Sequence, residues 1–287
     1  MDYKEYCAST YNYTFEQKYN EDLAGRTSQS AQVASERKAQ HQAILYTFET
    51  AIPEYSSSAS ITKIWNAIYR AHLLRKVNIT DIDDLDEGVV DAIISGAQSW
   101  KKCSGHVFEE YVVRATRDRL STYNIRLVLQ KELTQMISDG LISNDDSDQI
   151  SEIAHSDNFD IYAVVNVNGN NVVFGCVQAK TSIRDRVGRD RDFSSEVMNR
   201  NFWSAAVVLD GTYLAMPKFE KMVNGGGTTQ YSENGWHGMY VLSDATSNDR
   251  IYEDKDLTIL VEDARQAAEK FTSARQRFTR YWQALHQ

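Results

Sequence analysis

The spacing of apolar residues divides the chain into a helical first third and a mixed remainder. Apolar and aromatic side chains such as Tyr11 and Phe15 recur at helical intervals, and Pro53 with the serines after it indicates a break. Ser60 is suited to cap the helix that follows. The pattern predicts four helices, over residues 2–24, 28–50, 61–77 and 89–100. This part carries no candidate chemistry, so we interpret residues 1–99 as a helical N-terminal subdomain.

A further helix is predicted after Ser104, which is a suitable N-cap for the apolar positions Val107 and Phe108. Glu109 lies next to this apolar stripe, where a carboxylate is costly unless it is paired or bound to a metal. Two interpretations remain open, a surface glutamate with a basic neighbour or a metal ligand. The first suits Glu110 better, because Arg114 follows four residues later.

Two runs rich in Val, Ile, Tyr and Phe, Ile161–Val167 and Val172–Ala179, flank an Asn168-Gly169 step. Such a step predicts a β-hairpin with a type I′ turn. Asp160 and Lys180 lie almost equally far from the turn, so antiparallel pairing places them side by side at the open end. Gln178 and Lys180 are expected on one face of the sheet, because side chains alternate along a strand.

The remaining segments predict an α/β arrangement. The continuous apolar run Phe202–Leu209 is typical of a buried strand. Residues 224–238 contain several glycines and are expected to form a long loop. Further elements are predicted as a strand followed by a helix over 124–137, a helix start at 192–199, a strand at 239–242 and a helix over 257–285.

Composition narrows the class of protein. A hydrophobic content of 42% with 25% charged residues is ordinary for a globular protein, and no apolar run approaches the ~20 residues of a membrane span. The three widely spaced cysteines are expected to be free thiols in a reducing cytoplasm. A net charge of −9 argues against indiscriminate binding of nucleic acid, but arginines concentrated in one cleft remain compatible with a DNA partner.

The residues around the hairpin match the requirements of phosphodiester hydrolysis. A divalent cation must be held by carboxylates, and a side-chain cation must orient the nucleophile or offset negative charge on the phosphate. Asp160 and Glu109 are the candidate ligands, the carbonyl of Ala179 is a further oxygen donor, and Lys180 is the candidate cation. By itself, an aspartate before a hairpin that ends in Gln-Ala-Lys is a weakly specific pattern.

This arrangement resembles the PD-(D/E)xK nucleases, with an acid on a helix (Glu109), an acid opening a strand (Asp160) and a lysine closing the next (Lys180). Residues 104–109 (SGHVFE) and 180–186 (KTSIRDR) are similar to motifs of the type II restriction endonucleases that recognise CCGG-centred sites. The resemblance covers most of the chain. It implies Mg²⁺-dependent cleavage of double-stranded DNA at a palindromic CCGG site, and a palindrome calls for a homodimer or higher homo-oligomer.

Two departures from the family pattern stand out. Gln178 occupies the position of an acid, so it would be a weaker ligand within the catalytic set, and the number of metal ions is left open. Many enzymes of the CCGG group take their last acid from a helix after the lysine. Glu196 or Asp192 would fill that role here, although Glu109 matches the motif better.

The arginines after the lysine divide into two kinds. Arg184 and Arg186 can each pair with guanine, and Asp185 can accept a hydrogen bond from cytosine. Arg189 and Arg191 suit phosphate contacts, which set position without reading sequence. Without the adjacent site, an exposed loop with internal ion pairs explains the same pattern.

We therefore predict a restriction-endonuclease-like mixed sheet flanked by helices, with the catalytic and DNA-recognition domain over residues 100–287. Two alternatives stay open. One is a nuclease of the same fold with another target, such as a repair or recombination enzyme. The other is a DNA-binding module without catalysis, which the glutamine at position 178 keeps in view.

Overall fold

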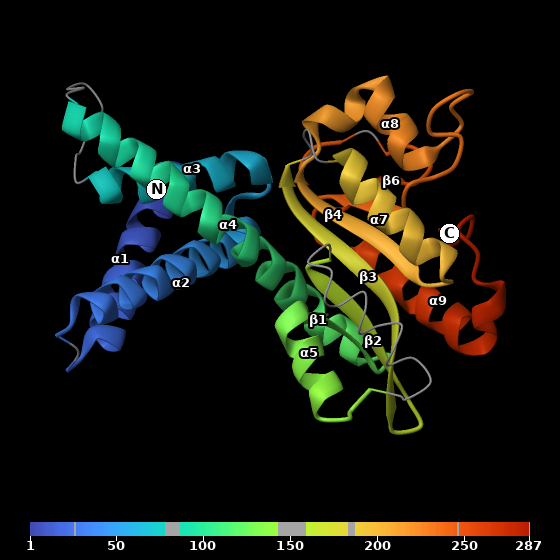
Figure 1. The fold of residues 1–287 in the computed structure, drawn as a ribbon. Coiled ribbons are helices and arrows are strands. Elements are labelled where there is room, and N and C mark those ends of the chain that lie inside the picture. The colour runs from blue at the N-terminus through green and yellow to red at the C-terminus, as the bar shows by residue number, and fades with distance from the viewer. Residues whose placement is uncertain (26, 78–86, 143–158, 183–186, 246, 287) are drawn as a thin grey trace. The chain divides into compact units, whose positions relative to one another are not determined.

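The computed structural model describes residues 1–25, 27–77, 87–142, 159–182, 187–245 and 247–286. The chain forms two compact units, Met1–Tyr111 and Val112–Gln287. The first unit is helical, and the second contains a sheet with helices on its faces (Figure 1). The division falls inside helix α4 (Glu87–Ser121), as does the expected boundary after residue 99, and the functional domain assignment remains a prediction.

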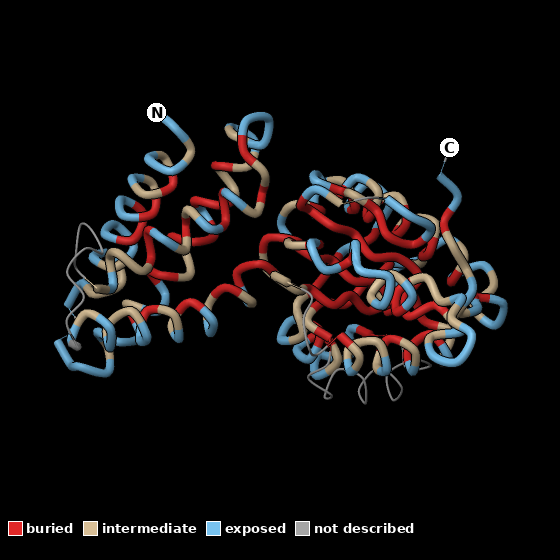
Figure 2. Tube along the Cα trace, turned by 90° about the horizontal axis from the view of Figure 1, so that it is seen from above, coloured by how far each residue is buried: buried red, intermediate tan, exposed pale blue. Residues whose placement is uncertain are grey.

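Aromatic side chains form the core of the first unit. The ring of Trp65 lies 4.7 Å from that of Phe48 and 5.2 Å from that of Trp100, and Phe48 also packs 4.8 Å from Tyr111. Tyr11 and Phe15, the aromatic residues noted for their helical spacing, are also buried. Buried stretches run along the helices of this unit (Figure 2). The helices before α4 are α1 (Tyr3–Leu23), α2 (Gln29–Tyr55) and α3 (Ile61–Val77).

Two predicted helix boundaries are wrong. Helix α2 continues through Pro53, which lies in its last turn, to Tyr55. The predicted helices before and after Ser104 are the single helix α4, so this serine is no N-cap. Trp100, Ser104 and Phe108 are all buried at intervals of one helical turn, so Ser104 continues the buried stripe as a small polar residue.

The second unit is built on a six-stranded mixed sheet in the order β1-β2-β3-β4-β5-β6. Strands β1 to β3 pair antiparallel, and β3 to β6 pair parallel. The mixed α/β fold predicted from the sequence is therefore confirmed. The strands are β1 (Ile125–Leu129), β2 (Ile161–Val167), β3 (Asn170–Ser182), β4 (Trp203–Asp210), β5 (Gly238–Val241) and β6 (Ile251–Glu253).

Helices cover both faces of this sheet (Figure 1). On one face, α7 (Val187–Asn199) and α8 (Pro217–Asn224) bury a core that includes Ala206 and Trp236. On the other face, Phe271 of α9 (Thr258–Ala274) packs 6.4 Å from Phe174 and 5.7 Å from Phe202. The remaining helical segments are α5 (Gln130–Ser138), η1 (Thr212–Ala215) and η2 (Arg275–Arg277).

The β2–β3 hairpin has the predicted tight turn, with positive φ angles of 52° at Asn168 and 89° at Gly169. The register then shifts at a bulge between Ala163 and Val164. Beyond the bulge Ile161 pairs with Val177, so Asp160 comes opposite the next residue of β3, Gln178. A one-residue shift changes which face a side chain occupies, so the bulge brings Asp160 onto the face of Gln178 and Lys180.

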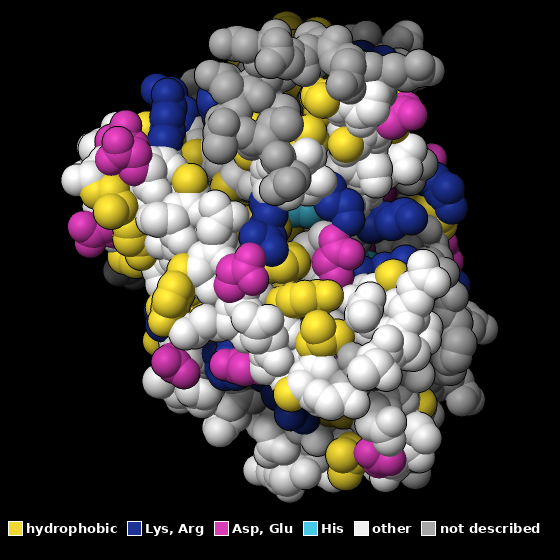
Figure 3. All heavy atoms as spheres, turned by 90° about the vertical axis from the view of Figure 1, so that its left-hand side faces the viewer, with side chains coloured by type: hydrophobic (Ala, Val, Ile, Leu, Met, Phe, Trp, Pro, Cys, Tyr) yellow, Lys and Arg dark blue, Asp and Glu magenta, His cyan; other side chains and the backbone are white. Residues whose placement is uncertain are grey.

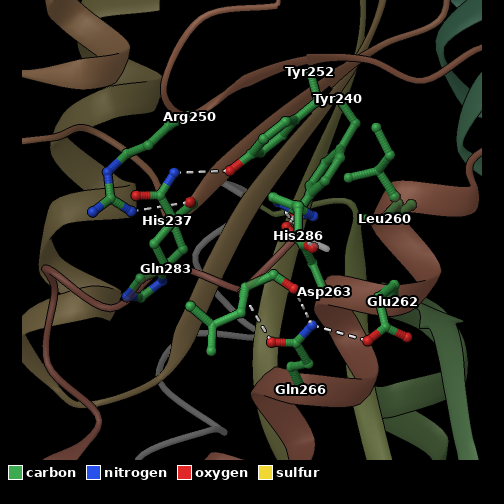
Figure 4. Close-up of polar contacts among 12 residues, drawn as sticks. His237, Tyr240, Arg250, Tyr252, Leu260, Glu262, Asp263, Gln266, Gln283 and His286 are labelled. Carbon is green, nitrogen blue, oxygen red and sulfur yellow. Dashed lines mark hydrogen bonds and ion pairs between the residues drawn. The ribbon is translucent and has the colours of Figure 1, made fainter.

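The end of the chain is less helical than predicted. Helix α9 ends at Ala274, and the segment after η2 runs back over β5 and β6 without helical structure. The guanidinium of Arg250 donates hydrogen bonds to the carbonyls of Tyr281 and Trp282, and Gln283 donates to the hydroxyl of Tyr252 (Figure 4). Arg250 thus satisfies two backbone carbonyls of a segment that has no helical hydrogen bonds of its own.

Two simpler expectations agree with the structure. Cys7, Cys103 and Cys176 are free thiols. Within the described residues, no helix combines the length and apolar character needed to cross a membrane.

Candidate active site

The site is centred on Asp160 and Lys180 at the open end of the β2–β3 hairpin. Oδ2 of Asp160 lies 3.1 Å from Nζ of Lys180 and accepts a hydrogen bond of 3.1 Å from the amide of Ala179. The two side chains are 21% and 31% exposed, so both reach solvent from a partly buried position. The predicted juxtaposition of these two residues is confirmed.

The donor set fits a hard cation with few protein ligands. Among the described residues there is no group of three or more His, Cys, Asp or Glu side chains that could hold a metal ion. Mg²⁺ commonly keeps several waters and takes only one or two protein carboxylates. Asp160 makes both of its contacts through Oδ2, which leaves Oδ1 available within the described part of the chain.

Gln178 shares the face of Lys180, but its amide is committed to the core. Gln178 as a whole is only 1% exposed to solvent. Oε1 accepts a hydrogen bond of 2.8 Å from the indole nitrogen of Trp236, and Nε2 donates one of 3.1 Å to the carbonyl of Asp190. Its place in the catalytic set remains a prediction, and these contacts point to a structural task.

The candidate acids outside the hairpin occupy different environments. Glu109 is in the first unit, with a side chain only 15% exposed and Oε2 3.1 Å from Nδ1 of His106. Its neighbour Glu110 lies 2.6 Å from Nε2 of His41. Glu196 is on α7, is mostly exposed and forms an ion pair of 2.7 Å with Arg200. The assignment of the third acid remains a prediction.

The predicted DNA contacts fall into three groups. Arg184, Asp185 and Arg186 lie outside the described residues. Arg189 is exposed on α7, with its guanidinium 5.4 Å from the ring centre of Phe193. Arg191 is partly buried and donates to two backbone carbonyls, those of residues 222 and 233. Burial also lowers the pKa of Arg191 from its ordinary value, as does the nearby positive charge of residue 280. Arg189 is thus the better placed of the two for a phosphate.

His106 and His237 each have a defined partner within the fold. His106 is an exposed partner of Glu109. His237 is buried, its Nδ1 accepts from the amide of Ser204, and its other ring nitrogen donates to the carbonyl of Thr279. Burial lowers the pKa of His237 to about 3, so this ring stays neutral and structural.

The face drawn in Figure 3 has no continuous patch of positively charged side chains among the described residues. Lys and Arg side chains there lie among Asp and Glu side chains. This mixed distribution agrees with the net charge of −9.

The sequence did not indicate that Trp236 and Asp190 are partners of Gln178. Neither hydrogen bond follows from local spacing, because Trp236 is 58 residues from Gln178 in the chain.

Comparison with known proteins places this chain in a family. A family model described as BsaWI restriction endonuclease type 2 matches residues 132–277. A crystal structure of the pre-specific BsaWI–DNA complex is 42% identical and aligns over 100% of both chains with a TM-score of 0.66. A specific AgeI–DNA complex is 17% identical over 88% of this chain and 91% of that one, with a TM-score of 0.48. No curated protein matches the chain. The chain therefore belongs to the BsaWI family of type 2 restriction endonucleases and is a site-specific endonuclease.

Proposed function

We propose that this enzyme hydrolyses phosphodiester bonds of double-stranded DNA at a palindromic site with a CCGG core, using Mg²⁺. The contact between Asp160 and Lys180 is the observation that carries the proposal. The similar BsaWI structure is a complex with DNA, which supports the same class of substrate here.

Asp160 would hold the cation, with Glu109 and the carbonyl of Ala179 as the further proposed ligands. A bound divalent cation polarises a phosphate and lowers the pKa of a coordinated water. Asp160 suits this role because its Oδ2 is oriented by the Ala179 amide and the Lys180 ammonium while Oδ1 stays available among the described residues.

Lys180 supplies the second requirement of the reaction. Its ammonium has three donors, so contact with Asp160 leaves others for a water or a phosphate oxygen. In that position it orients the attacking water or offsets the charge that develops on the phosphate. The strand holds the ammonium near the carboxylate before substrate arrives, which lowers the ordering cost during the reaction.

Recognition is assigned to the residues that follow the lysine. Arg184 and Arg186 would each donate two hydrogen bonds to guanine, and Asp185 would accept one from cytosine. Arg189 would contact a phosphate. A palindromic target read by one short motif calls for two copies of the chain related by two-fold symmetry, so we propose a homodimer or a higher homo-oligomer. A cytoplasmic location remains a prediction.

The direct test uses two plasmids of equal length, one with CCGG sites in varied flanking sequence and one without any. Wild-type enzyme should linearise only the first plasmid, in Mg²⁺ and not in EDTA, and Asp160→Ala should cut neither. Undiminished cutting in EDTA would contradict the metal requirement. Equal cutting of both plasmids would contradict the CCGG target while leaving an endonuclease.

A further inference from the structure

We propose that Gln178 is a positioning residue that anchors the first turn of α7 to strand β3. Its predicted effect on DNA recognition rests on the proposed function, whereas the anchor itself is a property of the fold. The proposal gives the glutamine a task other than weak metal binding.

The amide of Gln178 has one defined orientation. The indole nitrogen of Trp236 is solely a donor and the carbonyl of Asp190 is solely an acceptor, so Oε1 faces the first and Nε2 the second. Gln178 and Trp236 are each 1% exposed. Hydrogen bonds in such a setting matter because a buried polar group left without its partner is not compensated for the loss of its water contacts.

The three partners come from different segments of the second unit. Gln178 lies on β3 opposite Ala206 of β4. Trp236 precedes β5 and packs in one cluster with Ala206 and with Val187, the first residue of α7. Asp190 belongs to the first turn of α7. The side chain therefore ties that turn to the sheet close to Lys180, which follows two residues later on β3.

The same contacts explain why an amide is found where related nucleases have an acid. A glutamate could still accept from Trp236, but its second oxygen would face the carbonyl of Asp190 instead of donating to it. An apolar residue of similar length would make neither hydrogen bond. Of the residue types of this size, glutamine alone supplies an acceptor and a donor.

The anchor also limits how Lys180 and α7 are spaced. Six residues separate Lys180 on β3 from Val187, the first residue of α7, and the hydrogen bond from Gln178 to Asp190 holds the first turn of α7 to the same strand. If the anchor is lost, the start of α7 shifts relative to β3, whereas Asp160 and Lys180 stay paired within the hairpin. The consequence should therefore appear in recognition more than in the catalytic pair.

The test compares Gln178→Glu and Gln178→Met with Ser194→Ala. Ser194 is a matched control, because its buried hydroxyl forms a 2.6 Å hydrogen bond with Ser204 and so also joins α7 to the sheet, one turn further along. Amide hydrogen exchange at residues 191–194, whose helical acceptors are the carbonyls of the first turn, is the primary measurement. Two further measurements are made on each variant. One is its affinity in Ca²⁺ for CCGG and scrambled duplexes, and the other is its cleavage rate at limiting Mg²⁺.

Both Gln178 variants should exchange these amides faster, on the order of tenfold, after correction for global stability, and Ser194→Ala should not. Their preference for CCGG over scrambled DNA should fall by a similar factor. Unchanged exchange in both Gln178 variants would overturn the anchor. Stronger cleavage by Gln178→Glu at limiting Mg²⁺ would overturn it in favour of a weakened metal ligand.

The experiment distinguishes failure of the proposed function from failure of the anchor. If the wild-type enzyme shows no preference for CCGG, the target assignment fails, and the exchange measurement still decides the anchor without DNA. If Gln178→Glu is too unstable to purify, Gln178→Met alone decides the exchange measurement, because it also removes the hydrogen bond to the carbonyl of Asp190.

Discussion

Oδ2 of Asp160 lies 3.1 Å from Nζ of Lys180, although the two residues are 20 positions apart in the sequence. The hairpin turn brings the two strands together, and the bulge between Ala163 and Val164 brings Asp160 onto the face of the lysine. Both features are needed, because without the one-residue shift the carboxylate would be directed to the other face of the sheet.

Removing either side chain should abolish cleavage. Asp160→Ala and Lys180→Ala should each slow cleavage of a CCGG plasmid by on the order of a thousandfold or more, because each removes a charge that acts on the reacting phosphate. Specific binding in Ca²⁺ should be largely retained. The matched control is Lys255→Ala, which removes a surface lysine paired with Asp244 and Glu253 and should cut normally. Near wild-type cutting by either site variant would show that this pair is not the catalytic centre.

The hairpin illustrates what could be read from the sequence and what could not. Asn168-Gly169 predicted the turn because few other residue pairs tolerate two positive φ angles. The bulge was not predicted from the sequence. Its local sign is Gly175, next to the bulge on β3, but a glycine within a strand also fits a close approach of another backbone, here that of Trp203. The closeness of Asp160 and Lys180 was predicted correctly, but the reasoning from equal distances omitted the shift that determines their shared face.

The third acid can be identified by comparing two glutamates. Glu109→Ala should be severely impaired in cleavage, whereas Glu196→Ala should remain close to wild type, because Glu196 is exposed and paired with Arg200 on its own helix. Loss of that pair should cost only about 0.3–0.5 kcal/mol of stability. Single-turnover cleavage rates at saturating Mg²⁺ provide the measurement. An inactive Glu196→Ala enzyme with an active Glu109→Ala enzyme would place the acid after the lysine instead.

Arg189 and Arg191 should separate into a DNA contact and a structural contact. Arg191→Ala removes hydrogen bonds from a cation to the carbonyls of Met222 and Glu233 and should lower the free energy of unfolding by about 1–3 kcal/mol. Arg189→Ala should leave stability unchanged, weaken binding to CCGG and scrambled duplexes alike, and reduce the salt-dependence slope by about 1.

Urea unfolding and binding titrations at several salt concentrations distinguish these effects. The interpretation fails if Arg191→Ala is as stable as wild type and shows the reduced salt slope in place of Arg189→Ala. The sequence placed both arginines together as phosphate contacts because it shows charge and spacing, but not the carbonyls that Arg191 meets from distant segments.

Stability should depend on the protonation of Asp263 on α9. Tyr240 donates a hydrogen bond of 2.6 Å to this buried carboxyl, near the side chain of His286 (Figure 4). Burial raises the pKa of Asp263 from 3.8 to about 7, so its folded form binds a proton that the unfolded chain has already released. Its contribution to stability is therefore complete below pH 4 and is lost as pH rises through 7.

Asp263→Asn should remove this dependence. The free energy of unfolding of the variant relative to wild type should rise by roughly 3–4 kcal/mol between pH 4 and pH 8. His72 and His237 have lowered pKa values of about 4 and about 3 and destabilise the fold as pH falls, but they are present in both proteins and cancel in the difference. The free energies of unfolding are obtained from urea titrations at each pH. If the difference between Asp263→Asn and wild type stays constant over this pH range, the raised pKa of Asp263 is refuted.

The C-terminal segment is a second place where the structure differs from the sequence-based prediction. The apolar spacing over residues 257–285 predicted one helix, but regular helix stops at Ala274. Beyond it, Phe278 packs 5.1 Å from His237, and Arg250 binds two backbone carbonyls of the segment. These partners are close only in the folded protein, so periodicity along the chain could not distinguish a helix from a docked irregular segment.

Sequencing of fragment ends shows whether the Asp160–Lys180 centre cleaves DNA specifically at CCGG. A library of duplexes with a randomised centre is incubated with the wild-type enzyme in Mg²⁺, and Lys180→Ala serves as the matched blank. Every cleaved duplex should carry a CCGG core at a constant distance from its cut ends, and the blank should yield no such ends. Ends scattered over unrelated sequences, or the same CCGG-linked ends with Lys180→Ala, would refute cleavage at CCGG by this centre.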